Sequence, residues 1–563
     1  MNGAKHLLDV LLEHDVSTVF GYPGGAVIPL YHEWYSYREK IKHIRCSHEQ
    51  HAVHAADGYA RASGKVGVCF VTSGPGATNT ITGIATAYMD SVPLVVISGQ
   101  VPTTLLGKDS FQEIDMTGLT FSITKHNFLV RSIEDLDKSL RLAFKIASEG
   151  RPGPVVVDIP KDLFIAEVAK HSMSKNNHMK LEKLRNESEK IDNYKKLEYL
   201  IERLKTSKKP LFYIGGGIKI CFAEEIMKKI SEYFEIPIVN TLMGLGTIDR
   251  NHYLSLGLVG MHGSKEANMS ISECDLLVAV GARFSDRVIG NPKEFAKQAE
   301  IIHLDLDQTE VNKNIRVDSH IVGDLYDNLK YIVENLKKEA IDKAVKKERR
   351  EWLAWIRNQA SKKVSNNEDF TVDNIFSVIN KEYDENTIFA TDVGQHQMWT
   401  AQKIKFKDTR SFITSGGLGT MGFGLGAAIG AKIAKPMKNI VLITGDGSFK
   451  MNLNELSTIS DYKIKVDIIL IENKSLGMVR QWQSLFQEAI YAETSVVDSI
   501  DYQLLAQAYG LKGFYCRDLE ELKASLKKAK TEKMSTLTVV KLNSEEMVLP
   551  IVPPGKGISN FIE

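Results

Sequence analysis

Short runs of apolar, largely β-branched residues recur along the chain and end in glycine or acidic residues. Near the N-terminus they read VGVCFVTSG, PLVVISGQ and PVVVDIP, with helical patterns such as HAVHAADGYARASG between them. Continuous apolar runs of this length are typical of strands buried on both faces of a parallel sheet. The alternation of strand and helix therefore predicts an α/β chain built from doubly wound parallel sheets.

Two polar stretches divide this pattern into three parts. The stretch HSMSKNNHMKLEKLRNESEK is nearly free of large apolar residues, which indicates a linker. The pattern then restarts with runs such as PLFYIGGG and DLLVAVGARF, and the charged AVKKERREWLAWIRNQASKK predicts a solvated connecting helix before the third part. We expect domains at 1–165, 190–340 and 370–545 and a tail at 546–563, which fits a length of 563 residues.

Composition argues against several classes of protein. Lys plus Arg number 71 and Asp plus Glu 70, so there is no electrostatic reason to expect nucleic acid or a membrane as partner. Five scattered cysteines without a CxxC pair indicate a reducing, cytoplasmic setting rather than a disulfide framework. The N-terminus lacks the apolar core of a targeting segment. The apolar stretch 415–434 holds seven glycines, which predicts a tight loop and a packed helix rather than a membrane span.

An aspartate and an asparagine end two neighbouring strand-like runs of the third part. Asp446 follows VLITG, and Asn473 ends VDIILIEN after a spacing that fits one βαβ unit. Both side chains would lie at the carboxyl ends of adjacent parallel strands, where open α/β sheets bind ligands. Gly445 and Gly447 allow a phosphate to approach the backbone, and carboxylate, amide and diphosphate oxygens suit Mg²⁺. The alternative is that GDG is only a turn and Asn473 a helix cap.

This motif resembles the signature of thiamin-diphosphate-dependent enzymes. The resemblance implies that Asp446, Asn473 and the backbone carbonyl of Ser475 hold Mg²⁺. Glu472 stands where the family usually has another asparagine, and that position is not the metal ligand.

The segment IRCSHEQHAVHAADGYARASGKVGVCFVTSGPGATN resembles the pyrimidine-binding domain of the same family. It implies that Glu49, after a strand and at the start of a helix, hydrogen-bonds a pyrimidine nitrogen of the cofactor. The alternative is a first-turn glutamate favoured by the helix dipole. His51 stands where the family more often has glycine. Since this glutamate and the metal come from different subunits in the family, the resemblance also implies a homodimer or tetramer with interfacial active sites.

Further motifs narrow the resemblance to the acetolactate synthase (acetohydroxyacid synthase) family. They follow one another over nearly the whole chain as GYPGGAVIP, FQEIDMTGLT, TKHNFLV, RPGPVVVDIPKD, GMHGSKEAN, GARFSDR, TDVGQHQMW, GGLGTMGFGL and GMVRQWQ. The resemblance implies that pyruvate is decarboxylated on thiamin diphosphate and that the remaining two-carbon unit is joined to pyruvate or 2-ketobutyrate. The implied role is biosynthesis of branched-chain amino acids.

The resemblance also assigns residues to the cofactor and the substrates. The implied thiamin diphosphate contacts are Val393, Gly394, Gln395, His396, Gly419, Met421, Gly447 and Ser448. Gly25 and Gln112 would flank the reacting carbonyls, with Phe111 beside Gln112. The alternative for Met421 is ordinary core packing.

Three further residues are assigned to the acceptor ketoacid. Met478 and Trp482 are four residues apart and share one helix face, where they would shape the acceptor pocket. Arg287 would clamp the carboxylate of the acceptor. The alternatives are an amphipathic helix that buries Met478 and Trp482 in a core, and a surface salt bridge for Arg287.

GARFSDR resembles the RFxxR motif of the flavin-containing members, in which the flavin is mainly structural. The implied architecture is a pyrimidine-binding, a central FAD-binding and a diphosphate-binding domain. The implied FAD contacts are Arg151, Gly215, Gly216, Gly217, Thr241, Met243, Met261, His262, Gly281, Arg283, Gly323 and Asp324. Ser285 replaces the aspartate of the usual motif, and Gly426 replaces the proline of FGLP.

Other functions stay open at this point. A pyruvate-oxidase-type flavin oxidoreductase and a carboligase that uses another acceptor, such as glyoxylate, are compatible with the same fold. A catalytically inactive scaffold is disfavoured because Glu49, Asp446 and Asn473 are all present. Members of the family often bind a small regulatory subunit, which the resemblance adds as a candidate partner.

Overall fold

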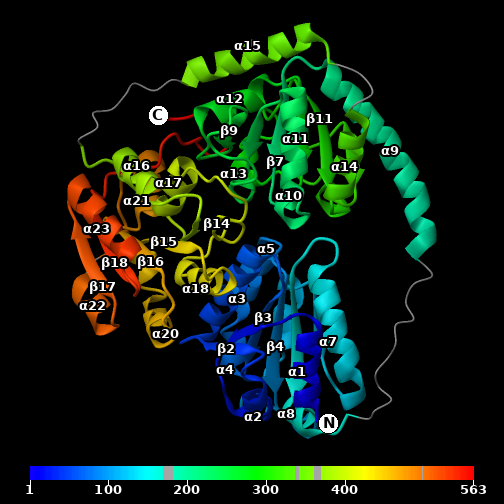
Figure 1. Cartoon of the computed structure of the whole chain (residues 1–563), viewed down its shortest axis with the longest axis vertical. Coiled ribbons are helices and arrows are strands. Elements are labelled where there is room, and N and C mark those ends of the chain that lie inside the picture. Colours follow the sequence, from blue (N-terminus) through cyan, green and yellow to red (C-terminus); the bar gives the residue numbers. More distant parts are fainter. Residues whose placement is uncertain (169–181, 337–340, 361–368, 497–498) are drawn as a thin grey trace. The chain divides into compact units, whose positions relative to one another are not determined.

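The computed structural model describes residues 1–168, 182–336, 341–360, 369–496 and 499–563. The chain forms two compact units. The first unit comprises Met1–Asn176, Lys381–Gln397 and Ile413–Glu546, and the second comprises Asn177–Asn380, Met398–Phe412 and Met547–Glu563. Three six-stranded sheets organise the described residues (Figure 1).

The first sheet has parallel strands in the order β2-β1-β3-β4-β6-β5. Its strands are β1 (Thr18–Gly21), β2 (Lys42–Arg45), β3 (Gly67–Val71), β4 (Leu94–Gln100), β5 (His126–Leu129) and β6 (Pro154–Pro160). The helices of this part are α1 (Gly3–Glu13), η1 (Gly25–Val27), α2 (Ile28–Tyr37), α3 (Glu49–Ser63), α4 (Pro75–Thr78), α5 (Ile81–Met89), η2 (Thr103–Leu105), α6 (Met116–Thr120), η3 (Phe121–Ile123), α7 (Ile133–Ser148) and α8 (Lys161–Ile165).

The central sheet has the order β12-β11-β10-β7-β8-β9, which is the strand order of dinucleotide-binding sheets. Its strands are β7 (Pro210–Ile214), β8 (Ile238–Asn240), β9 (Ser255–Leu258), β10 (Leu276–Val280), β11 (Glu300–Asp305) and β12 (Ser319–Val322). The helices are α9 (Glu182–Thr206), α10 (Gly217–Ile220), α11 (Glu224–Phe234), η4 (Leu242–Gly244), α12 (Lys265–Glu273), α13 (Asp286–Ile289), η5 (Gln308–Glu310), α14 (Leu325–Asn335) and α15 (Lys343–Ala360).

The third sheet, β14-β13-β15-β16-β18-β17, repeats the strand order of the first sheet. Its strands are β13 (Thr387–Thr391), β14 (Phe412–Ile413), β15 (Asn439–Gly445), β16 (Asp467–Glu472), β17 (Lys512–Cys516) and β18 (Thr536–Lys541). The helices are α16 (Val372–Glu382), α17 (Gln395–Lys403), α18 (Gly424–Ala434), α19 (Asp446–Phe449), η7 (Leu453–Glu455), α20 (Leu456–Asp461), α21 (Gly477–Phe486), α22 (Tyr502–Ala508) and α23 (Leu519–Thr531). The prediction of three doubly wound parallel sheets is confirmed.

Two polar segments differ from their sequence-based descriptions. The predicted linker lies in helix α9 from Glu182 onward, and its residues before Glu182, from position 171, lie outside the described residues. The predicted solvated helix is α15, and one of its faces is buried: Trp352 and Ile356 belong to a hydrophobic core of the second unit. The charged residues of α15 conceal this amphipathic pattern in the sequence.

Arg349 on the buried face of α15 is 1% exposed. Its guanidinium donates to the carbonyls of Leu204 and Ser207 at the end of α9, at 2.6 and 2.7 Å. It also donates to the carbonyl of Phe234 at the end of α11, at 2.6 Å. Because the last carbonyls of a helix lack partners within that helix, this arginine caps two helices at once.

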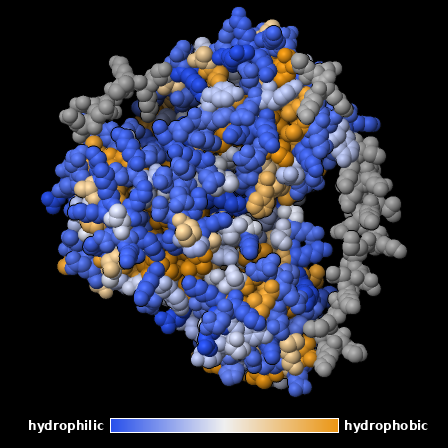
Figure 2. Space-filling model, in the orientation of Figure 1, coloured by the Kyte–Doolittle hydropathy of each residue, from blue (hydrophilic) through white to orange (hydrophobic). Residues whose placement is uncertain are grey.

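The stretch 415–434 is a loop followed by α18, as the glycine content predicts. Within the described ranges, no helix is long and apolar enough to cross a membrane. Figure 2 shows that hydrophilic residues cover most of one face of the molecule and that apolar residues occur there in scattered patches.

Helices α3 and α18 of the first unit pack at backbone contact. A Cβ added at Gly58 would lie 2.1 Å from the carbonyl oxygen of Ala427, and one added at Gly430 would lie 1.8 Å from that of Ala55. Gly426 is equally confined, with the carbonyl of His51 2.9 Å from such a Cβ. Two of the departures from the family pattern, His51 and Gly426, thus lie against each other.

We predict that Gly430→Ala destabilises the protein. In an isolated helix this change would stabilise the helix by about 1 kcal/mol. Here the added methyl group must push α3 away from α18, which lowers the free energy of unfolding by about 1–3 kcal/mol or more. Thermal unfolding should therefore show a lower midpoint for the variant. An unchanged or higher midpoint would contradict the close packing.

Candidate functional site

Asp446 and Asn473 lie at the carboxyl ends of β15 and β16, which are adjacent and parallel. Asp446 is 1% exposed, and its carboxylate accepts from the backbone N–H of Gly447 at 2.8 Å and of Lys474 at 2.7 Å. The side-chain oxygen of Asn473 accepts from the N–H of Ser475 at 3.1 Å. The three predicted metal-binding residues are therefore brought together in one buried turn region at the edge of the sheet.

The donor set at this edge suits a hard cation. Among the described residues, no group of three or more His, Cys, Asp and Glu side chains could hold a metal. A carboxylate, an amide oxygen and a backbone carbonyl are oxygen ligands, and Mg²⁺ commonly completes such a set with phosphate oxygens and water. The residues present fit Mg²⁺ together with a diphosphate.

Gln395 connects the start of α17 to this edge. Its side-chain oxygen accepts from Asn473 Nδ2 at 3.2 Å, and its amide nitrogen donates to Gln481 Oε1 at 3.1 Å and to the carbonyl of Glu546 at 2.7 Å. Gly477 leaves room for this arrangement, because a Cβ there would lie 2.0 Å from Gln395 Oε1. Gln481, which the sequence argument did not single out, is the buried contact of α21 with the site.

The other residues assigned to the diphosphate surround the same edge. The Ser448 hydroxyl donates to the carbonyl of Val393 at 3.0 Å. A Cβ at Gly447 would lie 3.7 Å from the Met421 side chain, and one at Gly419 would lie 4.0 Å from that of Val393. Met421 is half-buried and does not belong to a hydrophobic core of the described residues. These glycines leave a backbone surface that a bulky group can approach.

His396 and Gly394 are the last two of the residues assigned to the diphosphate. A Cβ at Gly394, whose φ is +154°, would lie 2.8 Å from the His396 ring. Burial lowers the pKa of His396 to about 3, so its ring is neutral at physiological pH and can serve as a hydrogen-bonding group without a charge.

Asp392 is a fully buried residue that the sequence argument missed. Its carboxylate accepts from the N–H of Gly424 at the start of α18, at 2.6 Å, and from the Thr444 hydroxyl, at 2.7 Å. Burial raises the pKa of Asp392, and the hydrogen bonds from Thr444 and Gly424 oppose that shift. The side chain ties the ends of β13 and β15 to α18, and the only sequence signal is its place after a strand-like run.

Glu49 begins α3 after β2, as predicted, and is half-buried. Asn79 Nδ2 donates to Glu49 Oε2 at 3.0 Å, while Oε1 accepts no hydrogen bond from the described residues. Glu49 Oε1 lies 3.2 Å from where a Cβ at Gly76 would be. One carboxylate oxygen is therefore held in place and the other is open to a ligand.

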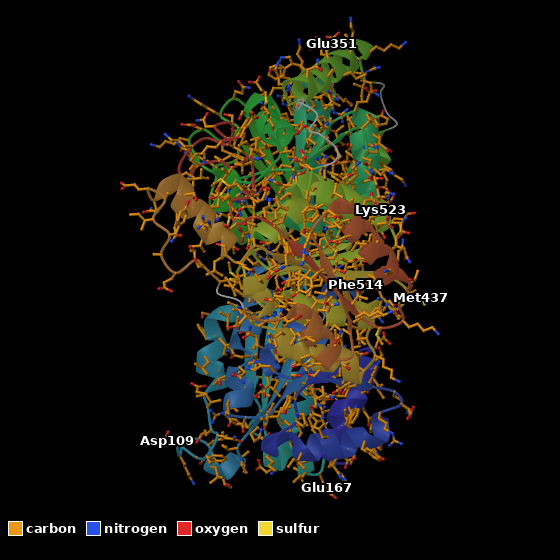
Figure 3. All side chains as sticks on the ribbon, turned by 90° about the vertical axis from the view of Figure 1, so that its left-hand side faces the viewer. Asp109, Glu167, Glu351, Met437, Phe514 and Lys523 are labelled. Atoms are coloured by element: carbon orange, nitrogen blue, oxygen red, sulfur yellow. The ribbon has the colours of Figure 1, made fainter. Side chains whose placement is uncertain are left out.

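Gly25 and Gln112 lie in the same sheet domain as Glu49. Gly25 begins η1, and a Cβ there would meet nothing within 4 Å. Gln112 has a left-handed backbone with φ of +61°, and its side chain contacts the position of a Cβ at Gly74. Non-glycine residues in this region are strained and cluster at functional sites. Phe111 is 88% exposed, and Asp109 of the same segment projects outward in Figure 3.

Met478 and Trp482 lie on α21, and both are half-buried. Trp482 contacts Phe486 with ring centroids 5.3 Å apart. Neither side chain belongs to a hydrophobic core of the described residues, which argues against the alternative that α21 buries Met478 and Trp482 in a core.

The residues assigned to FAD follow strands of the central sheet. Gly215–Gly217 follow β7 and Gly281 follows β10, at the point where the strand order reverses. A Cβ at Gly215 would lie 2.0 Å from the carbonyl of Gly281, so both loops need glycine. Apart from Arg151, the remaining residues follow β8, β9, β10 and β12 and are Thr241, Met243, Met261, His262, Arg283, Gly323 and Asp324. A dinucleotide fits this edge of such a sheet.

Three acidic or basic residues, Asp305, Asp324 and Arg151, bear on the assignment of the FAD site. Asp305 ends β11 at the same edge, where it was not singled out from the sequence, and it lies 3.4 Å from His303 Nε2. Asp324 caps α14 by accepting from the N–H of Tyr326 at 2.8 Å. Arg151 lies in the first unit, where it donates to Ser91 at 2.8 Å.

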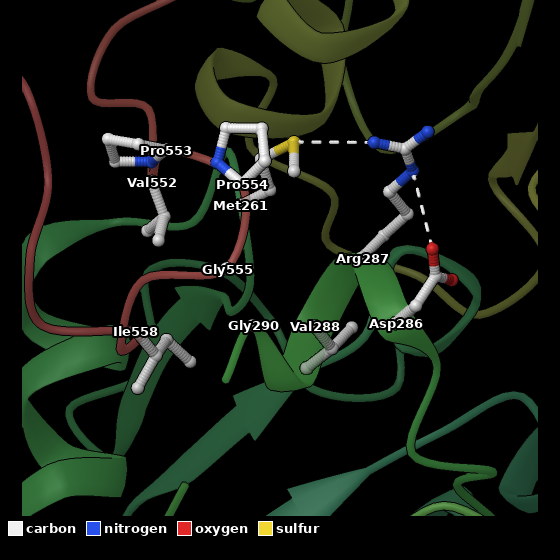
Figure 4. A pocket seen from close by; sticks show the side chains of 10 residues that line it. All are labelled: Met261, Asp286, Arg287, Val288, Gly290, Val552, Pro553, Pro554, Gly555 and Ile558. Carbon is white, nitrogen blue, oxygen red and sulfur yellow. Dashed lines mark hydrogen bonds and ion pairs between the residues drawn. The ribbon is translucent and has the colours of Figure 1, made fainter. Parts of the chain in front are cut away.

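Arg287 lines a pocket of about 200 Å³ in the second unit (Figure 4). The pocket is formed by Met261, the α13 segment and the tail residues Val552–Gly555 and Ile558. Arg287 Nη1 lies 3.7 Å from Met261 Sδ, and Nε lies 3.8 Å from Asp286. Such a long, exposed ion pair contributes little. Ser285 caps α13 by accepting from the N–H of Arg287, and serine and aspartate are both favoured at such a capping position.

Comparisons with known proteins agree with this arrangement. Residues 1–119 match the N-terminal TPP binding domain of thiamine pyrophosphate enzymes, 197–332 match the central domain, and 392–540 match the C-terminal TPP binding domain. The fold and the site thus define a thiamine pyrophosphate (thiamin diphosphate) enzyme.

Individual relatives define the family more closely. The chain is 44% identical to the probable acetolactate synthase large subunit of Methanocaldococcus jannaschii, over all of this chain and 95% of that one. It is 42% identical to the acetolactate synthase large subunit of Lactococcus lactis, over 98% and 95%. It is 41% identical to the acetolactate synthase isozyme 2 large subunit of Escherichia coli, over all of both chains. The chain belongs to the acetolactate synthase large subunit family.

A buried carboxyl is linked through Gln100 to the segment that carries Gln112. Asp158 in β6 is 2% exposed and accepts from Gln100 Nε2 at 2.9 Å, while Gln100 also donates to the carbonyl of Ile114 at 2.7 Å. Burial raises the pKa of Asp158 to about 7, despite the hydrogen bond from Gln100.

We predict a pH-dependent stability that Asp158→Asn removes. Because its pKa is raised in the folded state, Asp158 contributes fully to the free energy of unfolding below about pH 4. This contribution is lost as pH rises through 7, and the loss is at most about 4 kcal/mol. Asn keeps the acceptor for Gln100 but cannot ionise. Urea unfolding at pH 5 and pH 8 should show a smaller difference in the variant than in the wild type, with the exposed Asp109→Asn as control. Equal differences in all three proteins would refute this role.

Proposed function

We propose that this protein catalyses acetolactate synthesis, in which pyruvate loses CO₂ and the remaining two-carbon unit is joined to a second 2-ketoacid. Pyruvate as acceptor gives 2-acetolactate, and 2-ketobutyrate gives 2-aceto-2-hydroxybutyrate. The products would serve valine, leucine and isoleucine biosynthesis in the cytoplasm. The relatives that carry the name acetolactate synthase large subunit support this activity.

One observation carries the proposal. Asp446, Asn473 and Gln395 meet at one buried sheet edge, while α3, packed on α18 beside that sheet, begins with a carboxylate that has one oxygen held and one open. A metal–diphosphate edge together with such a carboxylate is what thiamin chemistry requires. A simple nucleotide site would have no use for Glu49.

The residues of the chain would act as follows. Thiamin diphosphate, when bound, supplies the carbon nucleophile that adds to pyruvate and accommodates the charge left by CO₂. Asp446, Asn473 and the carbonyl of Ser475 would hold Mg²⁺, and Val393–His396, Gly447 and Ser448 would hold the diphosphate. Glu49 Oε1 would hold the proton at a pyrimidine nitrogen, because Asn79 orients the carboxylate through Oε2. Gly419 and Met421 would support the cofactor ring.

The acceptor would be selected by a second group of residues. Arg287 would bind its carboxylate bidentately, and Met478 and Trp482 would form an apolar wall beside its alkyl group. Gly25 and Gln112 would contact the reacting carbonyls. An apolar wall of this kind discriminates one methylene by about 1–3 kcal/mol, which sets the scale of any preference for 2-ketobutyrate.

The proposal extends to domains, cofactors and partners. Residues 1–165, 190–340 and 370–545 would be the pyrimidine-binding, FAD-binding and diphosphate-binding domains, with 546–563 as the tail. FAD would bind the central sheet through the glycines after β7 and β10 and act structurally, because the net reaction transfers no electrons. The active protein would be a homodimer or tetramer with interfacial sites. The name large subunit, which the relatives carry, supports a small regulatory subunit as partner.

A product assay tests the proposal against its main alternative. The purified protein is given Mg²⁺, thiamin diphosphate, FAD and pyruvate, while products and flavin absorbance are followed together under anaerobic conditions. We expect acetolactate and CO₂ with the flavin remaining oxidised. Acetate, acetyl phosphate or a bleached flavin would contradict the proposal and establish a pyruvate-oxidase-type enzyme.

A further inference from the structure

The loop between β14 and α18 carries two of the cofactor residues, Gly419 and Met421. Its tip is exposed at Leu418 and Gly419, and Gly419 and Gly422 have left-handed φ values of +72° and +81°. A glycine-rich loop of this kind has many accessible conformations, so an anchor is needed to give it one shape.

Asp90 provides that anchor from the first sheet domain. One of its oxygens accepts from the backbone N–H of Gly417 at 2.7 Å, and the other accepts from that of Gly416 at 2.9 Å. The Asp90 side chain is fully buried. Thr86, one turn earlier on α5, adds a hydrogen bond of 2.7 Å between its hydroxyl and that of Thr420 in the same loop.

Arg61 in the last turn of α3 holds Asp90. Its Nη2 lies 3.0 Å from Asp90 Oδ2, and its Nη1 donates to the carbonyl of Thr414, where the loop begins, at 3.0 Å. Asp57, one turn earlier on α3, binds the guanidinium with both carboxylate oxygens. The Arg61 guanidinium also lies over the Phe423 ring, 5.4 Å from its centroid, where the loop ends.

The charges of this cluster explain why the loop is needed to complete it. Two buried carboxylates, Asp57 and Asp90, face one guanidinium, which leaves one negative charge in excess. Asp90 also ends α5, where the helix dipole disfavours a negative charge. The amides of Gly416 and Gly417 compensate that charge, so moving the loop away would leave the buried Asp90 carboxylate without these two backbone donors, at a high energetic cost.

We propose that Asp90, held by Arg61, is a positioning residue that fixes the loop 414–422 in the shape that receives thiamin diphosphate. The proposal rests on the proposed function for the identity of the cofactor. Asp90 and Arg61 act through the loop and do not themselves touch the reacting groups. Since α3 begins with Glu49 and ends near Arg61, one helix supports both the activating carboxylate and the cofactor loop.

Two measurements on Asp90→Asn test the proposal. The carboxamide keeps the shape but turns an N–H₂ group toward an N–H donor, so one loop contact is lost. Hydrogen–deuterium exchange of the cofactor-free full chain should become faster in the peptide that covers 414–422. The thiamin diphosphate concentration for half-saturation should rise roughly tenfold or more. FAD retention should not change, which separates loop displacement from misfolding.

Two further variants keep the test decisive. Asp461→Asn removes an exposed carboxylate that lies 3.4 Å from Arg45, and it should leave loop exchange and cofactor saturation unchanged. Arg61→Lys keeps the positive charge but loses the fork that reaches both Asp90 and Thr414, so it should change both readouts in the same direction as Asp90→Asn. It takes the place of Asp90→Asn if that variant does not fold.

The outcomes are distinct. Unchanged exchange in the loop would show that Asp90 does not anchor it, and faster exchange with unchanged cofactor saturation would show that the anchor does not position the cofactor. Either result overturns the inference. A wild-type protein that binds no thiamin diphosphate would instead overturn the proposed function together with the cofactor role of the loop.

Discussion

The packing of α3 on α18 is the contact on which the rest of the first unit depends. Small residues on both helices bring their backbones together, and glycine at 58 and 430 is required because a Cβ would meet a carbonyl oxygen. Helix α18 covers the sheet whose edge carries Asp446 and Asn473. Helix α3 carries Glu49 at its start and Arg61 near its end. The contact between α3 and α18 therefore helps to hold both the activating carboxylate, Glu49, and the cofactor loop 414–422 in place.

The carboxyl-terminal edges of the sheets also bring functional residues together. In a parallel sheet all strands end at the same edge, so the topology alone brings residues that follow different strands close together. The third sheet uses this for Asp446, Asn473 and Gln395, and the central sheet uses it for the glycines after β7 and β10. Buried polar groups then lock the loops: Asp392 holds the start of α18, and Asp90 holds the loop before it.

Sequence reasoning found what has a local signal. Central strands such as β15 and β16 are continuous apolar runs, whereas the edge strand β5 (HNFL) is mixed in character and was missed. The spacing of Asp446 and Asn473 predicted that they lie together, and the resemblance supplied Glu49. Asp90, Arg61 and Asp392 were not found because their partners include backbone N–H and C=O groups distant in sequence. Arg349 was missed because it bonds only to carbonyls, so a charged helix looked solvated.

The most direct test of the central claim, that α3 presents the activating carboxylate, is the exchange of the C2 proton of bound thiamin diphosphate with deuterium. The rate is measured by NMR after acid quenching in the wild type and in Glu49→Gln, at saturating Mg²⁺ and cofactor. The account predicts that both proteins bind the cofactor, that the wild type exchanges this proton much faster than free cofactor does, and that the variant loses nearly all of this acceleration. Equal exchange rates in the two proteins would contradict it.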